Sequence, residues 1–348
     1  MNIVRVVVID DSAYVRKVFK QMLLRSPFID VVGTARDGAE ALELVQELNP
    51  DVVTCDLNMP TMDGVEFVRQ QMARQPLPII ISSIASQSGE QVLAALDAGA
   101  MDFVQKPTAL ATDKLMNIGD ELVEKVKAAA QSPLRRVAIA AVPLDPVAAA
   151  PAAVRPAASK VEIVVIGTST GGPQALKRLI CRLPSDCPVP IAIVLHMPIG
   201  YTDMYARKLD EQSLLDVSEA RAGEAVTAGR VFIAPAGRHL SFRRQADGTV
   251  VIQLDVRPLD SLHRPSVDVM FQSAAEIFGE GVLGVVLTGM GSDGRDGAAW
   301  IKAKGGTLLT EAEESCVVYG MPRSVVDAGL SDESVTLDRM AQAIMDRI

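Results

Sequence analysis

Short apolar runs alternate with helix-like patterns in the first part of the chain. The runs are typical of strands buried on both faces, and they lie at residues 4–9, 31–35, 52–55, 78–81 and 103–104. Between them, apolar residues such as Val15, Phe19 and Met22 recur at three- and four-residue spacing, which is typical of helices. Five strand-then-helix units predict an α/β domain over residues 1–127 with a doubly wound parallel sheet.

The same alternation returns in the last part of the chain. Buried strands are expected at residues 161–166, 191–195, 231–234 and 282–287. Residues 239–243 and 249–255 alternate between apolar and polar, and Asp247-Gly248 between them is a hairpin signal. Residues 161–348 are therefore predicted to form a second doubly wound, Rossmann-like α/β domain that carries an antiparallel hairpin.

The segment at 128–160 interrupts both patterns. It contains 13 Ala and 5 Pro and has no sustained helical period. Because proline breaks helices and favours extended backbone, we expect a semi-rigid linker between the two domains.

Composition and charge exclude several classes of function. The formal net charge of −9 over 348 residues argues against a broad nucleic-acid-binding surface. No apolar stretch approaches the ~20 residues of a membrane span, and the N-terminus does not resemble a signal peptide. The four cysteines show no metal-ligand spacing, which favours reduced thiols. We therefore expect a cytoplasmic protein with no membrane insertion.

Acidic residues end two predicted strands of the first domain, and a lysine follows a third. Asp10 and Asp11 end the first strand, Asp56 ends the third, and Lys106 follows the fifth. Ligands of doubly wound sheets bind at the carboxyl ends of strands, so we expect these side chains to meet. Three clustered carboxylates require a cation, and Mg²⁺ suits carboxylate and phosphate oxygens.

Asp56 lies on the central strand and is the best candidate nucleophile for phosphoryl transfer, while Asp10 and Asp11 suit metal ligation. Lys106 can neutralise phosphoryl oxygens, and Ser82 or Ser83 can donate a hydroxyl. The alternative is that Asp-Asp-Ser at 10–12 only caps the helix expected at 12–24.

These residues, together with Met59-Pro60 and Asp63-Gly64, resemble the response-regulator receiver family over roughly residues 1–125. The resemblance implies that Asp56 is the phosphoacceptor, that a histidine kinase supplies the phosphoryl group, and that the Ser82 side of the pocket changes conformation.

A glycine-rich turn, Gly167-Thr-Ser-Thr-Gly-Gly172, joins a strand to a helix in the second domain. Such a turn can hold a phosphate at the helix N-terminus, but its spacing matches neither GxGxxG nor GxxxxGK[ST]. The other interpretation is that Ser169 is a nucleophile and that nearby backbone N–H groups form an oxyanion hole.

A nucleophilic serine requires a base and an acid. His196 ends the neighbouring strand and is the favoured base, ahead of His263 and His239. Asp293 follows a further strand and is the favoured acid, with Asp296 as the second choice. The alternatives are that His196 is a core histidine and that Asp293 caps the helix expected at 295–304. The order Ser, His, Asp and the absence of GxSxG exclude the α/β-hydrolase pattern.

The second domain resembles the catalytic domain of the CheB family of chemotaxis methylesterases, and the resemblance spans essentially the whole chain. The motifs that carry it are the turn at Ser169, Leu195-His-Met197, Ala234-Pro-Ala-Gly237, His263-Arg-Pro-Ser-Val-Asp268, and Thr288-Gly-Met-Gly with Asp293-Gly294. One departure is Thr168, where the family more often has alanine.

The resemblance implies a triad of Ser169, His196 and Asp293, with main-chain amides near Thr170 and Met290 as oxyanion donors. It implies demethylation of glutamate methyl esters and deamidation of glutamines on chemoreceptors, with Mg²⁺ needed for phosphorylation and no cofactor for ester hydrolysis. The implied partners are methylated chemoreceptor cytoplasmic domains and a sensor histidine kinase of the CheA type.

Two other functions compete with this interpretation. One is a non-catalytic, phosphorylation-dependent adaptor, and the other is a phosphoregulated esterase or amidase for small molecules. From the fusion of a receiver to a hydrolase, we expect the unphosphorylated receiver to limit access to Ser169.

Overall fold

The computed structural model describes residues 3–83, 89–106, 112–132 and 160–348, with the side chains of residues 112–117 left aside. The chain divides into two compact units with the boundary at residues 141 and 142.

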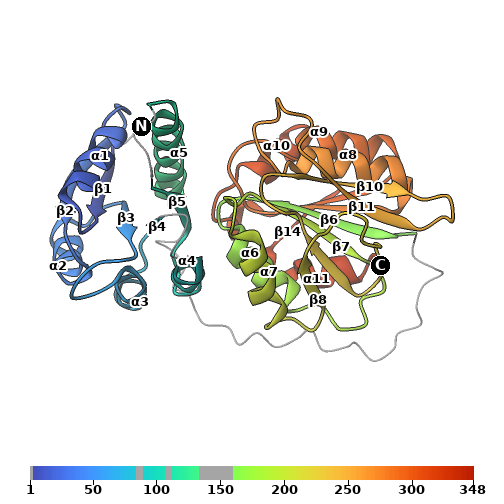
Figure 1. Cartoon of the computed structure of the whole chain (residues 1–348), viewed down its shortest axis with the longest axis horizontal. Helices are drawn as coiled ribbons and strands as arrows, with labels where there is room; N and C mark the ends of the chain where they lie inside the picture. Colours follow the sequence, from blue (N-terminus) through green and yellow to red (C-terminus); the bar gives the residue numbers. More distant parts are fainter. Residues whose placement is uncertain (1–2, 84–88, 107–111, 133–159) are drawn as a thin grey trace. The chain divides into compact units, whose positions relative to one another are not determined.

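The first unit contains a five-stranded parallel sheet with the strand order β2-β1-β3-β4-β5. Its strands are β1 (Val4–Ile9), β2 (Ile29–Ala35), β3 (Val52–Asp56), β4 (Ile79–Ser83) and β5 (Asp102–Gln105). Its helices are α1 (Ala13–Leu23), α2 (Gly38–Leu48), α3 (Gly64–Arg74), α4 (Gly89–Asp97) and α5 (Thr112–Gln131). Helices α1 and α5 contact each other, and α3 contacts α2 and α4, so the two groups cover opposite faces (Figure 1).

The second unit contains a seven-stranded parallel sheet with the order β14-β13-β12-β6-β7-β9-β8. Its strands are β6 (Ile163–Thr168), β7 (Ile191–Leu195), β8 (Asp216–Glu219), β9 (Arg230–Ile233), β12 (Val282–Val286), β13 (Thr307–Glu311) and β14 (Glu333–Val335). The antiparallel hairpin consists of β10 (His239–Arg244) and β11 (Val250–Asp255).

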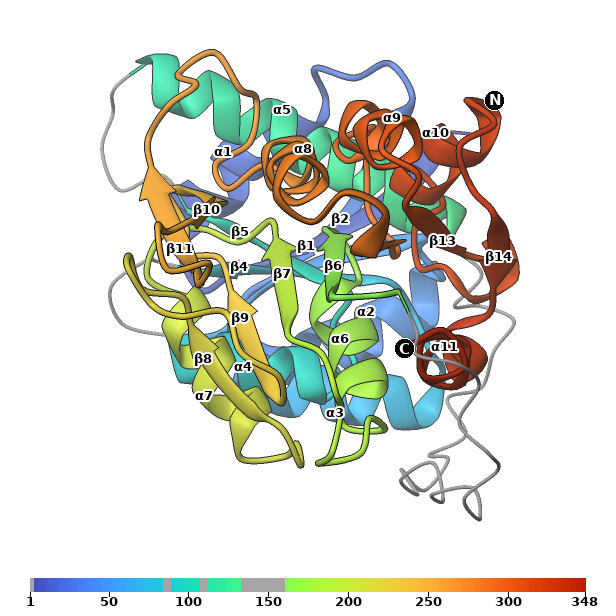
Figure 2. The same cartoon turned by 90° about the vertical axis from the view of Figure 1, so that its right-hand side faces the viewer.

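Six helices cover the large sheet. They are α6 (Gly172–Ile180), α7 (Thr202–Asp210), α8 (Val267–Phe278), α9 (Arg295–Ala303), α10 (Met321–Asp327) and α11 (Leu337–Met345). Figures 1 and 2 show α8, α9 and α10 over one face of the sheet and α6, α7 and α11 over the other. The hairpin packs against α8, and Phe242, Ile252, Phe271 and Met270 belong to one buried cluster.

The predicted fold class is confirmed, because both units contain parallel sheets with helices on two faces and the hairpin forms where it was expected. The strands expected at 4–9 and 191–195 have these bounds in the structure. Strands β8, β13 and β14 were not predicted, because they are short and contain few consecutive apolar residues.

One boundary differs from the prediction. Helix α5 continues to Gln131, so residues 128–131 are helical and not part of an extended linker. The three alanines at 128–130 favour helix, and Ala129 is fully buried. The remainder of the predicted linker, residues 133–159, lies outside the described residues. Within the described residues, no helix has the length and hydropathy needed to cross a membrane.

Candidate active site

The register of the large sheet places Ser169 and His196 beside each other. Thr168, the last residue of β6, lies opposite Leu195, the last residue of β7, so the next residue of each strand is one of this pair. The N–H of His196 donates to the carbonyl of Thr168 at 3.1 Å, which extends the ladder to the edge of the site. The adjacency expected from the strand ends is therefore present in the backbone.

The turn after β6 positions Ser169 at the start of α6. Gly171 has a φ of 79° and is the N-cap residue of this helix, in a conformation that side chains rarely adopt. The N–H of Gly172 donates to the carbonyl of Ser169 at 2.7 Å and closes the turn. Pro173 then occupies the first helical turn, where its missing N–H costs nothing.

His196 and Asp293 form a buried pair at the carboxyl edge of the sheet. Nε2 of His196 lies 2.8 Å from Oδ2 of Asp293, and the two side chains are 9% and 7% exposed. Nδ1 of His196 is buried and has no hydrogen-bond partner among the described residues. Because the carboxylate engages Nε2, Nδ1 is the nitrogen available to take a proton from a neighbouring hydroxyl.

Asp293 is held by the N-terminus of α8. It accepts hydrogen bonds from the hydroxyl of Ser266 at 2.9 Å, the N–H of Val267 at 2.8 Å and the N–H of Asp268 at 3.0 Å. Burial alone would raise the pKa of Asp293, but the hydrogen bond and charge of His196 and these backbone donors hold it below its usual range. The carboxylate therefore stays ionised and can stabilise an imidazolium.

Asp293 does not cap the helix that follows it. The N-cap of α9 is Gly294, which provides no side-chain hydrogen bond. Asp293 instead binds the N-terminus of a different helix, α8, 25 residues earlier in the chain. The alternative that Asp293 caps the helix expected at 295–304 is therefore wrong, because Asp293 caps α8 instead.

The other candidate bases and acids occupy different environments. Asp296 is 72% exposed and pairs with Arg295. Both ring nitrogens of His239 are engaged, one by the N–H of Ser266 at 3.2 Å and the other at 3.2 Å from the carbonyl oxygen of Pro258. His263 lies close to the pair, because its ring stacks on that of His196.

Thr288, just after β12, connects to the turn that carries Ser169. Its carbonyl accepts the N–H of Ser169 at 3.1 Å and the hydroxyl of Thr168 at 2.7 Å. Its own hydroxyl donates to the carbonyl of Thr170 at 3.0 Å. Thr168, the departure from the usual alanine, therefore adds a buried hydrogen bond to this connection.

The side chain of Glu311 holds the backbone of Thr288 in place. It lies at the end of β13, is fully buried, and accepts the N–H of Thr288 at 2.8 Å and the hydroxyl of Ser315 at 3.0 Å. Burial raises the pKa of this carboxyl, although the two donors lower it. Glu311 was not among the predicted site residues because the short apolar content of β13 did not indicate a strand there.

The segment that carries Met290 passes very close to Ser169. A Cβ at Gly289 would lie 3.0 Å from both the backbone nitrogen and the Cβ of Ser169, so only glycine allows this approach. The carbonyl of Gly289 accepts the N–H groups of Gly320 and Met321 at 3.1 and 2.9 Å. Met290 and Thr170 thus belong to the two backbone segments that border Ser169.

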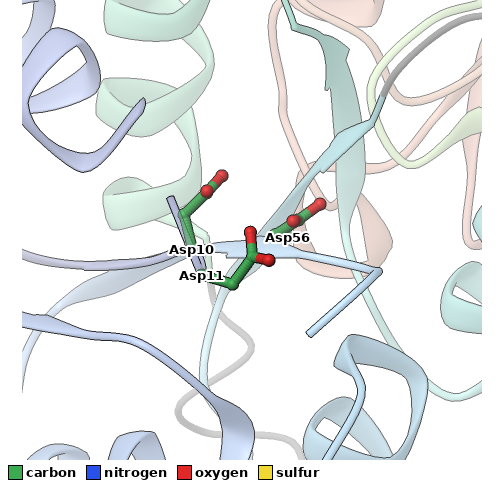
Figure 3. Close-up of side chains that lie close together, drawn as sticks. All are labelled: Asp10, Asp11 and Asp56. Carbon is green, nitrogen blue, oxygen red and sulfur yellow. The ribbon is translucent and has the colours of Figure 1, made fainter. Parts of the chain in front are cut away.

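The acidic pocket of the first unit lies at the carboxyl ends of β1 and β3. Figure 3 shows Asp10, Asp11 and Asp56 together, and one carboxylate oxygen from each lies within 4.8 Å of the others. Nζ of Lys106 lies 2.6 Å from Asp10 and 2.8 Å from Asp56. Ser82 lies opposite Asp56 in the register of β3 and β4, so it stands at the same edge of the sheet as this cluster.

The donor set of this pocket fits Mg²⁺. Asp10 and Asp56 are buried while Asp11 is exposed, so a bound ion would have protein oxygens on one side and water on the other. Burial raises the pKa of Asp10 even though Lys106 lowers it. Ser12 caps α1 by accepting the N–H of Val15, and Asp10 accepts the N–H of Ser12 at 3.0 Å, so the Asp-Asp-Ser segment caps the helix and also contributes carboxylates to the pocket.

Comparison with known proteins matches both halves of the chain. Residues 164–344 match the family model described as CheB methylesterase, and residues 6–118 match the response regulator receiver domain. A protein-glutamate methylesterase/protein-glutamine glutaminase of Myxococcus xanthus is 49% identical over 97% of this chain and 96% of its own length. One from Symbiobacterium thermophilum is 45% identical over 98% of this chain and 96% of its own length.

The chain belongs to the CheB methylesterase family. The crystal structure of the Thermotoga maritima CheB methylesterase catalytic domain is also similar, with 42% identity and a TM-score of 0.53. It covers 54% of this chain and 99% of that one, so the likeness is confined to the catalytic unit. The expected family and the expected class of enzyme, a carboxylic ester hydrolase with a receiver domain, are confirmed.

Two features of this CheB protein were not predicted from the sequence. Ser266 and Asp268 hold the Asp293 loop, yet the His263–Asp268 motif contributed only to the resemblance and no role was assigned to either residue. The Thr288–Glu311 contact depends on pairing between β12 and β13, which no local pattern indicated.

Proposed function

We propose that this chain hydrolyses γ-glutamyl methyl esters of chemoreceptors to glutamate and methanol, and deamidates receptor glutamines, with Ser169, His196 and Asp293. The observation that carries the proposal is the buried His196–Asp293 pair, which leaves Nδ1 of the histidine as the available base. The register that sets Ser169 beside His196 and the family membership support the same assignment.

In the acylation step, Oγ of Ser169 bonds to the ester carbonyl carbon while its proton passes to Nδ1 of His196. The main-chain amides of Thr170 and Met290 stabilise the oxyanion. The C–O bond to the methoxy group then breaks, and the leaving group takes the proton from His196 and departs as methanol. With a glutamine substrate, the C–N bond breaks and ammonia leaves.

In the deacylation step, water gives one proton to His196 and bonds to the glutamyl carbonyl carbon. The bond to Oγ of Ser169 breaks and the proton on His196 returns to the serine. The product leaves as the glutamate carboxyl group, which loses its remaining proton to solvent. Asp293 remains ionised throughout and stabilises the imidazolium of both steps.

The first unit supplies regulation in this proposal. Asp56 accepts a phosphoryl group from a CheA-type kinase, with Asp10, Asp11 and Asp56 as the residues that hold Mg²⁺ and with Lys106 and Ser82 as supports. The ion supplies charge neutralisation that lets an anionic donor approach. The proposed organisation is a receiver at 1–127, a connecting segment at 128–160 that begins with the end of α5, and a catalytic domain at 161–348 in a cytoplasmic protein.

Methanol release from methyl-labelled receptor membranes tests the proposal, with and without acetyl phosphate and Mg²⁺. We expect release that depends on Ser169 and rises with the phosphodonor. Turnover of small free esters as fast as receptor esters would favour a small-molecule esterase. Receptor binding without any Ser169-dependent turnover would favour an adaptor.

A further inference from the structure

Helices α8 and α9 exchange their N-terminal caps through two aspartates. Asp293, just before α9, accepts the backbone N–H groups of Val267 and Asp268 at the start of α8. In return, Oδ1 of Asp268 accepts the N–H of Gly294 at 2.9 Å and the N–H of Gly297 at 2.7 Å at the start of α9. Each carboxylate thus satisfies backbone donors that its neighbour's helix leaves unpaired.

Through this exchange, Asp268 holds both the side chain of Asp293 and the backbone that follows it. The backbone of Asp268 binds the carboxylate of Asp293, and the side chain of Asp268 binds the residue that follows Asp293. Gly294 provides no side-chain cap of its own for α9, so Asp268 replaces it. Loss of the Asp268 carboxylate would release the loop that aims Asp293 at His196.

The two helices approach too closely for other residues at the contact. A Cβ at Gly297 would lie 2.9 Å from both Cα and the carbonyl oxygen of Asp268. Gly294 has a φ of 100°, and a Cβ there would lie 2.9 Å from Val267. Glycines at positions 294 and 297 therefore allow Asp268 to approach the backbone of α9.

Asp268 also adds a titratable group next to the triad acid. The pKa of Asp268 is raised to about 6, first by burial and then by the charge of Asp293, against the lowering effect of the N–H of Gly297. Asp268 and Asp293 lie among other titratable groups. These are Asp296 beside α9, His196 after β7, His263 in the loop before α8 and His239 at the start of β10.

We propose that Asp268 is a positioning residue of this hydrolase, which holds Asp293 against His196 and adds negative charge that favours the protonated imidazole. The proposal rests on the triad assigned above. Ionised Asp268 adds a second negative charge behind Asp293, which stabilises the imidazolium formed at His196 during the reaction, whereas neutral Asp268 does not.

Two variants separate position from charge. Asp268→Asn keeps an oxygen that can accept from Gly294 and Gly297 but removes the charge. We expect it to keep a maximal kcat within about threefold of the original, with the acid limb of kcat/KM moved about half a pH unit downward. Asp268→Ala removes the cap as well, and we expect kcat to fall about tenfold or more with little change in KM.

The measurement uses the full-length protein with receptor membranes, acetyl phosphate and Mg²⁺ over a range of pH, with a melting curve for each variant. Asp296→Asn is the matched control, since it removes an exposed charge from the same helix start, and its profile should follow the original. The inference is overturned if both Asp268 variants keep the original pH limb and kcat, or if they lower only the melting temperature.

The failure of this inference is distinguishable from the failure of the proposed function. If Ser169→Ala is inactive while both Asp268 variants have the original kinetics, the triad holds and the role of Asp268 is wrong. If Ser169→Ala keeps its activity, the triad itself is wrong, and this inference falls with it.

Discussion

The imidazole rings of His196 and His263 are stacked, with their centroids 4.0 Å apart and their planes 18° from parallel. Together with the hydrogen bond from Nε2 to Asp293, this contact defines the plane of the His196 ring. His263 reaches the site from the loop that precedes α8, the same helix that holds Asp293. One segment of the chain therefore orients both His196 and Asp293.

Replacement of His263 separates stacking from acid–base chemistry. We expect His263→Phe to retain most of the hydrolytic rate, because phenylalanine can stack on His196 without a titratable group. His263→Ala should lose about two- to tenfold in kcat, in line with the ~0.5–1.5 kcal/mol that aromatic pairs contribute. Steady-state kinetics on receptor membranes measures this, and an inactive His263→Phe would instead make His263 the base.

Ser169→Ala should abolish methanol release and ammonia release together, because one nucleophile serves both reactions. The expected loss is about a thousandfold or more, and His196→Ala combined with it should add little. Both products are measured from the same reaction, and Ser213→Ala in the loop before β8 serves as the control. If Ser169→Ala kept a tenth of the original turnover, the assignment of the nucleophile would be wrong.

Phosphorylation of Asp56 should require a divalent cation and should slow as the pH falls. The folded pKa of Asp10 is raised above its unfolded value, so this carboxyl takes up a proton at a higher pH than an ordinary aspartate and then binds Mg²⁺ more weakly. The labelling rate with a small phosphodonor, measured against pH and Mg²⁺ concentration, checks this. Rapid labelling in excess chelator, or labelling of Asp56→Asn at the original rate, would contradict it.

A fragment that begins near Lys160 should be more active than the unphosphorylated full-length enzyme and indifferent to phosphodonor. The reason is that the receiver is expected to limit access to Ser169 until Asp56 is phosphorylated. A change of 1.4 kcal/mol in that equilibrium alters the open population about tenfold, which a new dianion can supply. A fragment that only matched the basal rate of the full-length enzyme would make the receiver an activator.

The sequence predicted the framework of the site because the framework depends on local patterns. The apolar run at Ile191–Leu195 defines β7 without ambiguity, and parallel strands carry their functional residues at their carboxyl ends, so His196 could be placed beside Ser169. The same reasoning placed Asp56 near Lys106 in the first unit.

The supporting contacts could not be predicted because they join segments whose pairing no local pattern reveals. β13 has only Leu308 and Leu309 as consecutive apolar residues, so neither the strand nor the buried Glu311 at its end was evident. Asp268 is separated from Gly294 by 26 residues, and only the close packing of two helices brings them together. A polar residue that caps another helix looks, in sequence, like any exposed aspartate.

The two sites also become complete at different times while the chain is being synthesised, because their residues lie at different places along it. β6 pairs with β7 on one side and with β12 on the other, and Thr168 and Thr288, which bond across the second pairing, are 120 residues apart. Ribosomes build chains from the N-terminus, so one edge of β6 stays unpaired until β12 emerges. A nascent chain therefore has all residues of its acidic pocket once Lys106 is made, long before it has Asp293 to complete the site around Ser169.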